Sequence, residues 1–249
     1  MRNLALVLVS LAACGGAPKP SSVGNVAGAG APAGPPPTIG WSGGAPNEGG
    51  TFDVHGLPAV SDDGSRVLVG WEQGDGGRGY PNLRLVVLDR GDQTLETRVV
   101  LDADQVDDGA TVDVAPHDQY LADSNAKLRW RALAPAPVEQ VAESEPEAEG
   151  PYPTRQTATL GDVTIRFDDG GHLVIEQDGK PVVDKVESGW LVASHPMYDG
   201  AGPDEVCSNP IFLDSAWVDA ARRLAVVDVE YRGNDSCWEP TGVYHVVTW

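Results

Sequence analysis

Cysteine and positive charge are both scarce in this chain. Only 3 cysteines occur among 249 residues, and 17 lysines and arginines stand against 37 aspartates and glutamates, for a formal net charge of −20. Such a surface repels phosphate backbones and anionic lipid head groups. The charge therefore excludes nucleic acid and direct electrostatic docking on a membrane, and it leaves cationic partners and divalent ions open.

Long hydrophobic runs are missing as well. No stretch approaches the roughly 18 apolar residues of a membrane-spanning helix, so an integral membrane protein is not expected. The nearest candidate is the N-terminus, where Arg2 precedes a short apolar run over residues 4–11. A positive residue followed by a run of this length is typical of an export signal.

The export signal ends in Leu11-Ala12-Ala13-Cys14, which resembles the lipobox of bacterial lipoproteins. The resemblance implies cleavage before Cys14 and lipidation of its thiol. An ordinary signal peptide cut at Ala13 is the alternative. Gly15 follows the cysteine, and in Gram-negative lipoproteins an aspartate there favours the inner membrane. The resemblance therefore predicts a lipid-anchored protein of the outer membrane that faces the periplasm, with palmitate on Cys14.

The two remaining cysteines predict a disulfide. Cys207 and Cys237 form an even pair in an oxidising compartment. Their bridge would close a loop of about 30 residues and stabilise the chain by roughly 3.5 kcal/mol in the chain-entropy model. A metal site would recruit His195 or His245, but neither Cys-x-x-Cys nor His-x3-His spacing is present. We therefore expect no metal site and no cofactor.

Composition divides the chain into five segments. Residues 1–13 are the signal peptide. Residues 14–50, mostly Gly, Ala, Pro, Ser and Asn, are predicted to be a disordered tether with a reach on the order of 35 Å. Residues 134–153 alternate prolines with five glutamates and are predicted to be an acidic linker or exposed loop, with a partner-binding tract as the alternative. They separate two β-rich halves, residues 51–133 and 154–249, the second with the disulfide.

Both halves carry the pattern of a mainly β protein with one short helix. Runs of Val, Leu, Ile and aromatic residues alternate with Gly and Asp clusters, which favour tight turns. Strands are predicted at residues 66–71, 83–89, 95–101, 163–167, 172–176, 181–186, 223–231 and 243–249. A helix is predicted over residues 116–126, with Pro116 in its first turn and Tyr120 and Leu121 facing the core.

Within residues 223–231, both faces of the strand are apolar. Leu224, Val226 and Asp228 share one face, while the intervening valines and alanine share the other. Such a strand is expected to be covered on both sides, with Asp228 at the rim of a buried surface.

A weak internal repeat relates the halves. Residues 59–69 align with residues 216–226, and each copy reads as strand, turn, strand, loop and strand. The first copy, with Ser61-Asp62-Asp63-Gly64 in its turn, resembles the strand turn in blades of TolB-like propellers over about thirty residues. Two copies do not close a propeller. The repeat therefore predicts a meander, a small sandwich, an open barrel or paired sheets.

Motifs for catalysis are weak. Residues 40–44 satisfy the G-x-S-x-G pattern around Ser42, but the predicted tether offers neither the strand nor the helix that a nucleophile elbow requires. The five histidines show no metal-ligand spacing. Four aspartates precede Gly109, at positions 102, 104, 107 and 108, but Val106 occupies the fifth position of a calcium loop. A solvated loop is expected there, with a weak calcium site as the alternative.

The aromatic residues of the last third suggest a carbohydrate or aromatic-ligand platform if they gather on one exposed face; otherwise they belong to the core. They are Trp190, Tyr198, Trp217, Tyr231, Trp238, Tyr244 and Trp249.

Three functions stay open. The first is an envelope-anchored protein that binds an envelope partner without catalysis. The second is a periplasmic hydrolase that uses acids such as Asp228, Glu230, Asp235 and Glu239. The third is passive structural bulk. We favour the first and predict no catalytic residues.

Overall fold

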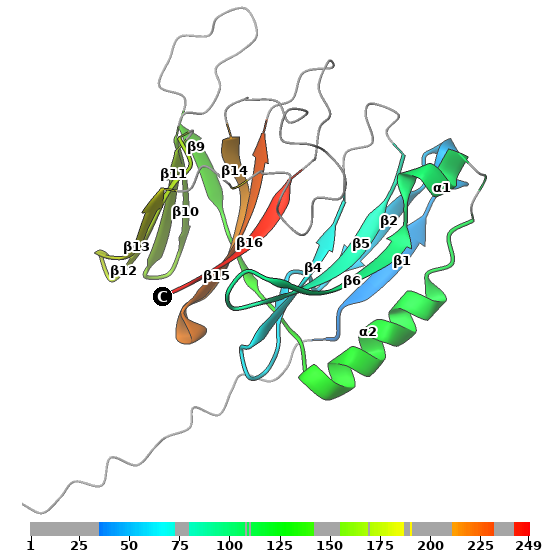
Figure 1. Ribbon diagram of the computed structural model, residues 1–249, viewed down its shortest axis with the longest axis horizontal. Helices are drawn as coiled ribbons and strands as arrows, with labels where there is room; N and C mark the ends of the chain where they lie inside the picture. Colours follow the sequence, from blue (N-terminus) through cyan, green and yellow to red (C-terminus); the bar gives the residue numbers. More distant parts are fainter. Residues whose placement is uncertain are drawn as a thin grey trace, which may run out of the picture. The chain divides into compact units, whose positions relative to one another are not determined.

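Antiparallel strands dominate the fold, as expected for a mainly β protein. The computed structural model describes residues 35–72, 80–107, 109, 111–141, 155–168, 170–186, 190, 211–231 and 242–249. Within these residues the strands form one two-stranded ribbon and three larger sheets. We call the larger ones the α2 sheet, the central sheet and the β12 sheet (Figure 1).

The α2 sheet has the strand order β6-β5-β4-β3-β7. Its strands are β3 (Ala59–Val60), β4 (Arg66–Trp71), β5 (Leu83–Asp89), β6 (Thr94–Leu101) and β7 (Arg131–Ala132). Residues 85–88 of β5 are all buried, so this strand is covered on both faces.

The helix α2 (Ala115–Leu128) and the ribbon of β1 (Thr38–Ser42) and β2 (Thr51–His55) share a core with the α2 sheet. Pro116 lies in the first turn of the helix, where its missing N–H costs nothing. Arg129 ends the helix in the left-handed conformation, and its N–H donates to the Asn125 carbonyl. Leu121 is buried and Tyr120 packs beside this core, which confirms the predicted helix and its inward face. Two short helices lie elsewhere, η1 (Pro46–Glu48) and α1 (Ala103–Asp107).

The central sheet has the order β16-β15-β14-β8. Its strands are β8 (Ala134–Ala136), β14 (Ile211–Asp219), β15 (Leu224–Tyr231) and β16 (Val243–Thr248), and η2 (Ala220–Arg222) joins β14 to β15. Residues 224–229 of β15 are all buried. The predicted cover on both sides of this strand is confirmed.

The β12 sheet has the order β13-β12-β11-β10-β9. Its strands are β9 (Val138–Val141), β10 (Arg155–Leu160), β11 (Val163–Asp168), β12 (His172–Gln177) and β13 (Lys180–Val186). Alternate residues of β11 are buried, so one face packs inward and the other faces solvent.

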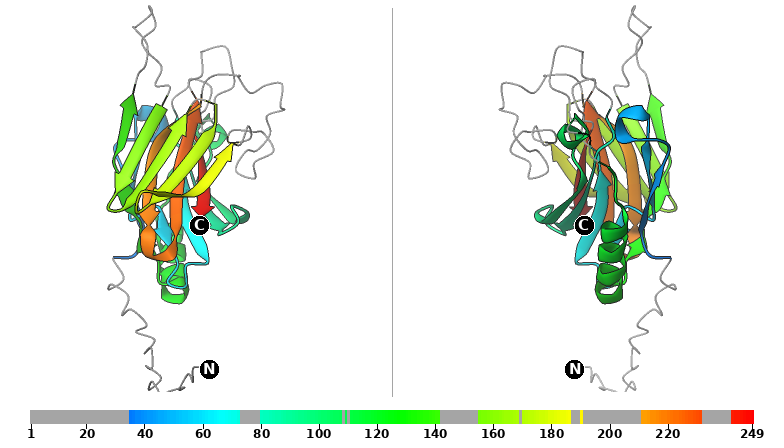
Figure 2. Two further views of the ribbon diagram at one scale, coloured as in Figure 1. Left: turned by 90° about the vertical axis from the view of Figure 1, so that its left-hand side faces the viewer. Right: turned by 90° about the vertical axis from the view of Figure 1, so that its right-hand side faces the viewer.

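One large core joins the three sheets. It contains residues of β4 and β5, of β14, β15 and β16, and of β10, β11 and β12. The central sheet therefore lies between the other two (Figure 1). The two side views look along this stack, with the β12 sheet in front in the left panel and α2 in front in the right panel (Figure 2). Because this core draws on both β-rich halves of the sequence, the halves share one fold.

Two parts of the expected segment map are corrected by the structure. Thr38–Ser42, assigned to the tether, form β1, because pairing with β2 satisfies their backbone and Ile39 is buried. Ala134–Ala136 and Val138–Val141, assigned to the linker, form β8 and β9. Both are edge strands, where proline and alternating glutamate are tolerated. Pro46–Glu48, also assigned to the tether, form η1. Residues 14–34 and 142–153 of these two segments lie outside the described residues.

The two copies of the weak repeat are both antiparallel hairpins. One consists of β3 and β4, the other of β14 and β15. The two hairpins differ in register by two residues. Leu68 and Ala225 are equivalent in the repeat, but Leu68 pairs with Ala59, whereas Ala225 pairs with Val218, two residues beyond the equivalent of Ala59. The two turns touch, since the Arg222 guanidinium donates to the Asp62 carbonyl at 3.2 Å.

Candidate functional site

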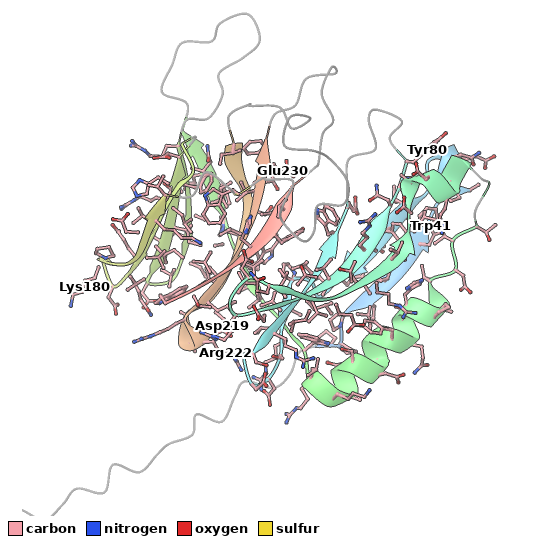
Figure 3. The ribbon with its side chains drawn as sticks, viewed as in Figure 1. Trp41, Tyr80, Lys180, Asp219, Arg222 and Glu230 are labelled. Atoms are coloured by element: carbon pink, nitrogen blue, oxygen red, sulfur yellow. The ribbon has the colours of Figure 1, made fainter. Side chains whose placement is uncertain are left out.

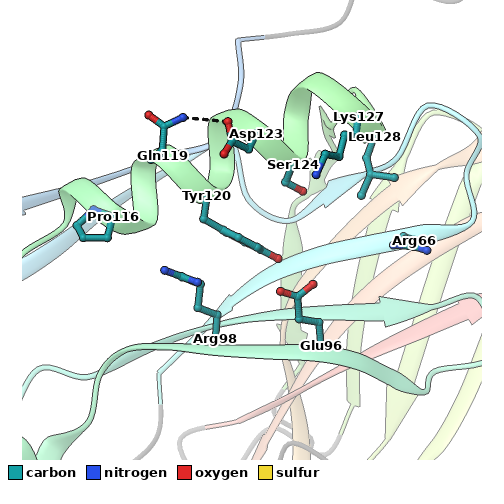
Figure 4. Close-up of a pocket in the computed structure, with 10 residues that line it drawn as sticks. All are labelled: Arg66, Glu96, Arg98, Pro116, Gln119, Tyr120, Asp123, Ser124, Lys127 and Leu128. Atoms are coloured by element: carbon teal, nitrogen blue, oxygen red, sulfur yellow. Dashed lines mark hydrogen bonds between the residues drawn. The ribbon is translucent and has the colours of Figure 1, made fainter.

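A cavity of about 500 Å³ lies between α2 and the α2 sheet (Figure 4). We call it the α2 groove. Its helical wall consists of Pro116, Gln119, Tyr120, Asp123, Ser124, Lys127 and Leu128. These positions recur every three or four residues and so form one face of the helix. Its sheet side consists of Arg66 on β4 and of Glu96 and Arg98 on β6.

Arg98 is held in place in the groove from two sides. Its Nε donates to His117 Nδ1 at 3.1 Å, and its guanidinium lies 4.9 Å from the centre of the Tyr120 ring. Burial, followed by the Arg98 charge, lowers the pKa of His117, so the imidazole is neutral and accepts this bond. An arginine anchored through Nε keeps its two terminal amino groups for a planar acceptor.

The acidic side chains of the groove are engaged. Burial and a hydrogen bond with Glu96 raise the pKa of Tyr120 to about 12, so the phenol donates to that carboxylate. Asp123 accepts from Gln119 Nε2 at 2.9 Å. The side chains of Arg66 and Lys127 have no hydrogen bond or ion pair within the described part of the chain. The unsatisfied groups of the groove are therefore mainly cationic donors.

A second polar site lies on the central sheet, on the side of the α2 sheet. Asp228 and Glu230 alternate along β15, and Asp214 on β14 lies beside them. One ligand atom from each falls within 4.8 Å of the other two. We call these three residues the acidic cluster. Glu230 lies at the end of β15 opposite the turn that contains Asp219 and Arg222 (Figure 3).

Burial and mutual repulsion disturb the titration of the acidic cluster. Burial, with the charge of Asp214 second, raises the pKa of Asp228 to about 7. Burial and the charges of Asp228 and Asp214 raise the pKa of Glu230 to about 8. Tyr244 on β16 lies opposite Asp228 and donates a hydrogen bond to it. Burial and the Asp228 charge raise the pKa of Tyr244 well above its usual value.

Several expected site residues fall outside the described part of the chain. They are Cys14, Cys207, Cys237, His195, Tyr198, Asp235, Trp238 and Glu239. The lipidation site, the disulfide and part of the acid set of a hydrolase therefore stay predictions.

The four described histidines bind separate partners. His55 lies 3.1 Å from Asp53, and His172 lies 2.8 Å from Asp184. His117 accepts from Arg98, and His245 contacts Asp92 and the Trp190 carbonyl. None of them belongs to the acidic cluster.

The remaining motifs have structural roles. Ser42 ends β1, and its hydroxyl lies 3.1 Å from that of Thr51. The expectation of a solvated loop before Gly109 is wrong in part, because residues 103–107 form α1. Val106 is buried there, and Asp102 forms an ion pair with Arg84 at 2.9 Å.

The described aromatic side chains of the last third belong to the core. Trp190 is buried, and its indole N–H donates to the Gly171 carbonyl. Trp217, Tyr244 and Trp249 are partly buried and pack against the same core.

Sequence reasoning named Asp228 and Glu230 but missed Asp214 and the α2 groove. Asp214 lies on another strand, and strand pairing is not visible in a short window. Of the groove residues on α2, sequence reasoning named only Pro116, at the start of the helix, and Tyr120, as facing the core. The helical spacing of the groove residues could have indicated one common face.

Comparisons of the chain with protein-family models, with curated proteins and with solved structures give no match. Among the described residues, no helix is long and apolar enough to cross a membrane. The class defined by the fold and its sites is a layered antiparallel β protein with a cationic groove and a partly buried acidic cluster.

Proposed function

We propose that this chain is a lipid-anchored protein of the outer membrane whose β-rich body faces the periplasm and binds, without catalysis, an acidic segment of an envelope protein in the α2 groove. The lipobox-like residues 11–14 support the anchor. The binding role depends on one observation. The side chains of Arg66 and Lys127 and the terminal amino groups of Arg98 have no acceptor among the described residues, and all three side chains line the groove.

Carboxylates fit these donors best. The guanidinium of Arg98 is oriented by His117 and by the ring of Tyr120, and a fork held in this way binds a carboxylate through two hydrogen bonds. Lys127 lies seven residues after Tyr120, about 10 Å further along the helix. An extended peptide with acidic side chains reaches both positions. Because the rest of the chain is strongly acidic, it repels such a peptide elsewhere and favours the groove.

Site-specific photo-crosslinking tests the groove. A benzoylphenylalanine in place of Gln119, in the full anchored protein in cells, is expected to capture an envelope protein through an Asp- or Glu-rich peptide. The matched control replaces Ala122, which is exposed on α2 outside the groove. Arg98→Gln and Lys127→Gln should each remove the adduct. Equal capture from both positions, or capture unaffected by the charge variants, contradicts the proposal.

The anchor has its own test. Radiolabelled palmitate is expected to enter the wild-type protein, and Cys14→Ser should abolish the label and leave an uncleaved precursor. Label that persists in Cys14→Ser contradicts a lipid anchor at this residue.

A hydrolase is the second candidate, favoured by the raised pKa values of Asp228 and Glu230. A carboxyl group with a pKa near neutrality is suited to proton transfer. The protein should then cleave glycosides or esters from a chromogenic panel, and Glu230→Gln should remove that activity. A wild-type protein inactive on the panel favours the binding function.

A further inference from the structure

Asp214 lies at a β-bulge of β14, opposite the acidic residues of β15. The register of β14 against β15 shifts between Leu213 and Ser215, so that Leu213 pairs with Val229 while Ser215 pairs with Asp228. Asp214 is the additional residue between them. Two residues of a bulged strand lie opposite one residue of its partner, so Asp214 and Ser215 both lie opposite Asp228. This pairing keeps the Asp214 carboxylate beside those of Asp228 and Glu230.

Asp228 is the buried member of the cluster. Only 8% of its surface is exposed, and Oδ1 has no hydrogen-bond partner within the described part of the chain. A buried carboxylate oxygen without a partner is costly, because the free energy of its lost hydration is not replaced. An oxygen of this kind indicates that an electron-poor group, such as a cation, binds beside it.

Gly242 keeps the space beside this oxygen clear. A Cβ on Gly242 would lie 2.5 Å from Asp228 Oδ1 and 2.9 Å from Glu230 Cγ. The backbone here is held from the other side, since the Trp71 indole N–H donates to the Gly242 carbonyl at 2.6 Å. Trp71 and Gly242 thus place a residue without a side chain against the two carboxylates.

Negative charge is not balanced within the cluster. Within the described residues, neither a lysine nor an arginine forms an ion pair with Asp214, Asp228 or Glu230. The hydrogen bond from Tyr244 and the charge of His245 only partly oppose the rise in the pKa of Asp228. Glu72, directly after β4, adds further negative charge at Tyr244. The field of the whole chain, with a net charge of −20, adds to this attraction for a cation.

We propose that Asp214, Asp228 and Glu230 bind a calcium ion. The three side chains of the cluster offer only carboxylate oxygens, which do not suit the soft metals that prefer thiolate or imidazole. The three ligand atoms lie within 4.8 Å of one another, so one cation can contact all of them. Ca²⁺ takes about six to eight oxygen ligands in a flexible geometry, whereas Mg²⁺ demands a near-ideal octahedron and keeps several waters. Carboxylates from two neighbouring strands therefore suit calcium better than magnesium. This site is separate from the α2 groove and does not depend on the proposed function.

Terbium luminescence tests the site on the full chain. Tb³⁺ replaces Ca²⁺ at oxygen sites and emits when a nearby aromatic side chain absorbs light, a role for which Tyr244 and Trp71 are placed. Wild-type protein should sensitise Tb³⁺, and added Ca²⁺ should quench the emission at concentrations at least tenfold lower than Mg²⁺. Asp228→Asn and Glu230→Gln should each weaken Ca²⁺ binding at least tenfold. Glu139→Gln is the matched control, since this exposed glutamate lies on β9 away from the cluster.

Thermal unfolding separates loss of binding from loss of fold. Ca²⁺ should raise the melting temperature of the wild type and of Glu139→Gln but not of Asp228→Asn. Without Ca²⁺, Asp228→Asn should melt no lower than the wild type, because it removes a repelled buried charge. The proposal is overturned if Tb³⁺ emission persists in both cluster variants. It is equally overturned if Mg²⁺ quenches as well as Ca²⁺, or if Ca²⁺ leaves the wild-type melting temperature unchanged.

Discussion

Asp92 and His245 join two sheets across 153 positions of sequence. The His245 Nδ1 atom lies 2.6 Å from Asp92 Oδ2, and Asp92 Oδ1 accepts from the Val246 N–H at 2.6 Å. Asp92 lies in the turn between β5 and β6 of the α2 sheet, whereas His245 and Val246 belong to β16, the edge strand of the central sheet. The Asp92 carboxylate thus accepts a backbone hydrogen bond from the edge strand β16 and connects that strand to the α2 sheet.

Removing this carboxylate should destabilise the fold. Asp92→Ala removes the acceptor of the Val246 N–H and the contact of His245 Nδ1, each at a cost of about 1–3 kcal/mol. Asp92→Asn keeps one acceptor oxygen and should lose less. Urea denaturation measures both. Equal stability of Asp92→Ala and the wild type would show that the junction contributes nothing.

Asp63 should make stability pH-dependent at low pH. Its carboxylate accepts from the Ser61 and Ser65 hydroxyls and from the Ser65 N–H, which lowers its pKa from 3.8 to about 2. Because the folded pKa lies below the unfolded one, the stabilisation is complete above about pH 4 and is lost as the pH falls toward 2.

Asp63→Asn should therefore be less stable than the wild type at neutral pH, by an amount that shrinks between about pH 4 and pH 2. Denaturation curves over this range provide the measurement. A difference that stays constant with pH would mean that the charge of Asp63 has no part in the turn.

The cysteines offer a test by double mutation. If Cys207 and Cys237 are bridged, Cys237→Ala should lower the free energy of unfolding by roughly 3.5 kcal/mol. Cys207→Ala should match it, and the double variant should lose no more than either single variant, because the same bridge is lost. Additive losses, or two thiols that alkylate readily in protein from the periplasm, would disprove the bridge.

A cut in the acidic segment should leave the fold intact. β8 and β9 precede residues 142–153 of this segment, yet they pair with β14 and β10, which follow it. A protease site inserted after Pro146 should therefore yield two fragments that elute together from a size-exclusion column. Separate elution of two folded fragments would show instead that the halves are autonomous.

Local chemistry explains what was predictable. All eight predicted strands and the helix at Pro116 were found, because hydrophobic alternation, turn residues and a first-turn proline act within a few positions. The two-sided burial of β15 also follows from its own residues. The same reasoning failed for β1, β8 and β9, whose composition resembles loops and whose backbone is satisfied by strands far away in sequence.

The sequence by itself predicts an export signal, and it determined the acidic charge, the β class and the residues that can chemically serve as ligands or bridges. Only the tertiary structure decided which of them meet. Asp214 meets Asp228 because β14 pairs with β15 in a register that places them opposite one another, and Arg98 is oriented by a helix that packs across its sheet. Such meetings depend on register and layer packing, which are set by burial of the whole chain and not by any short stretch of it.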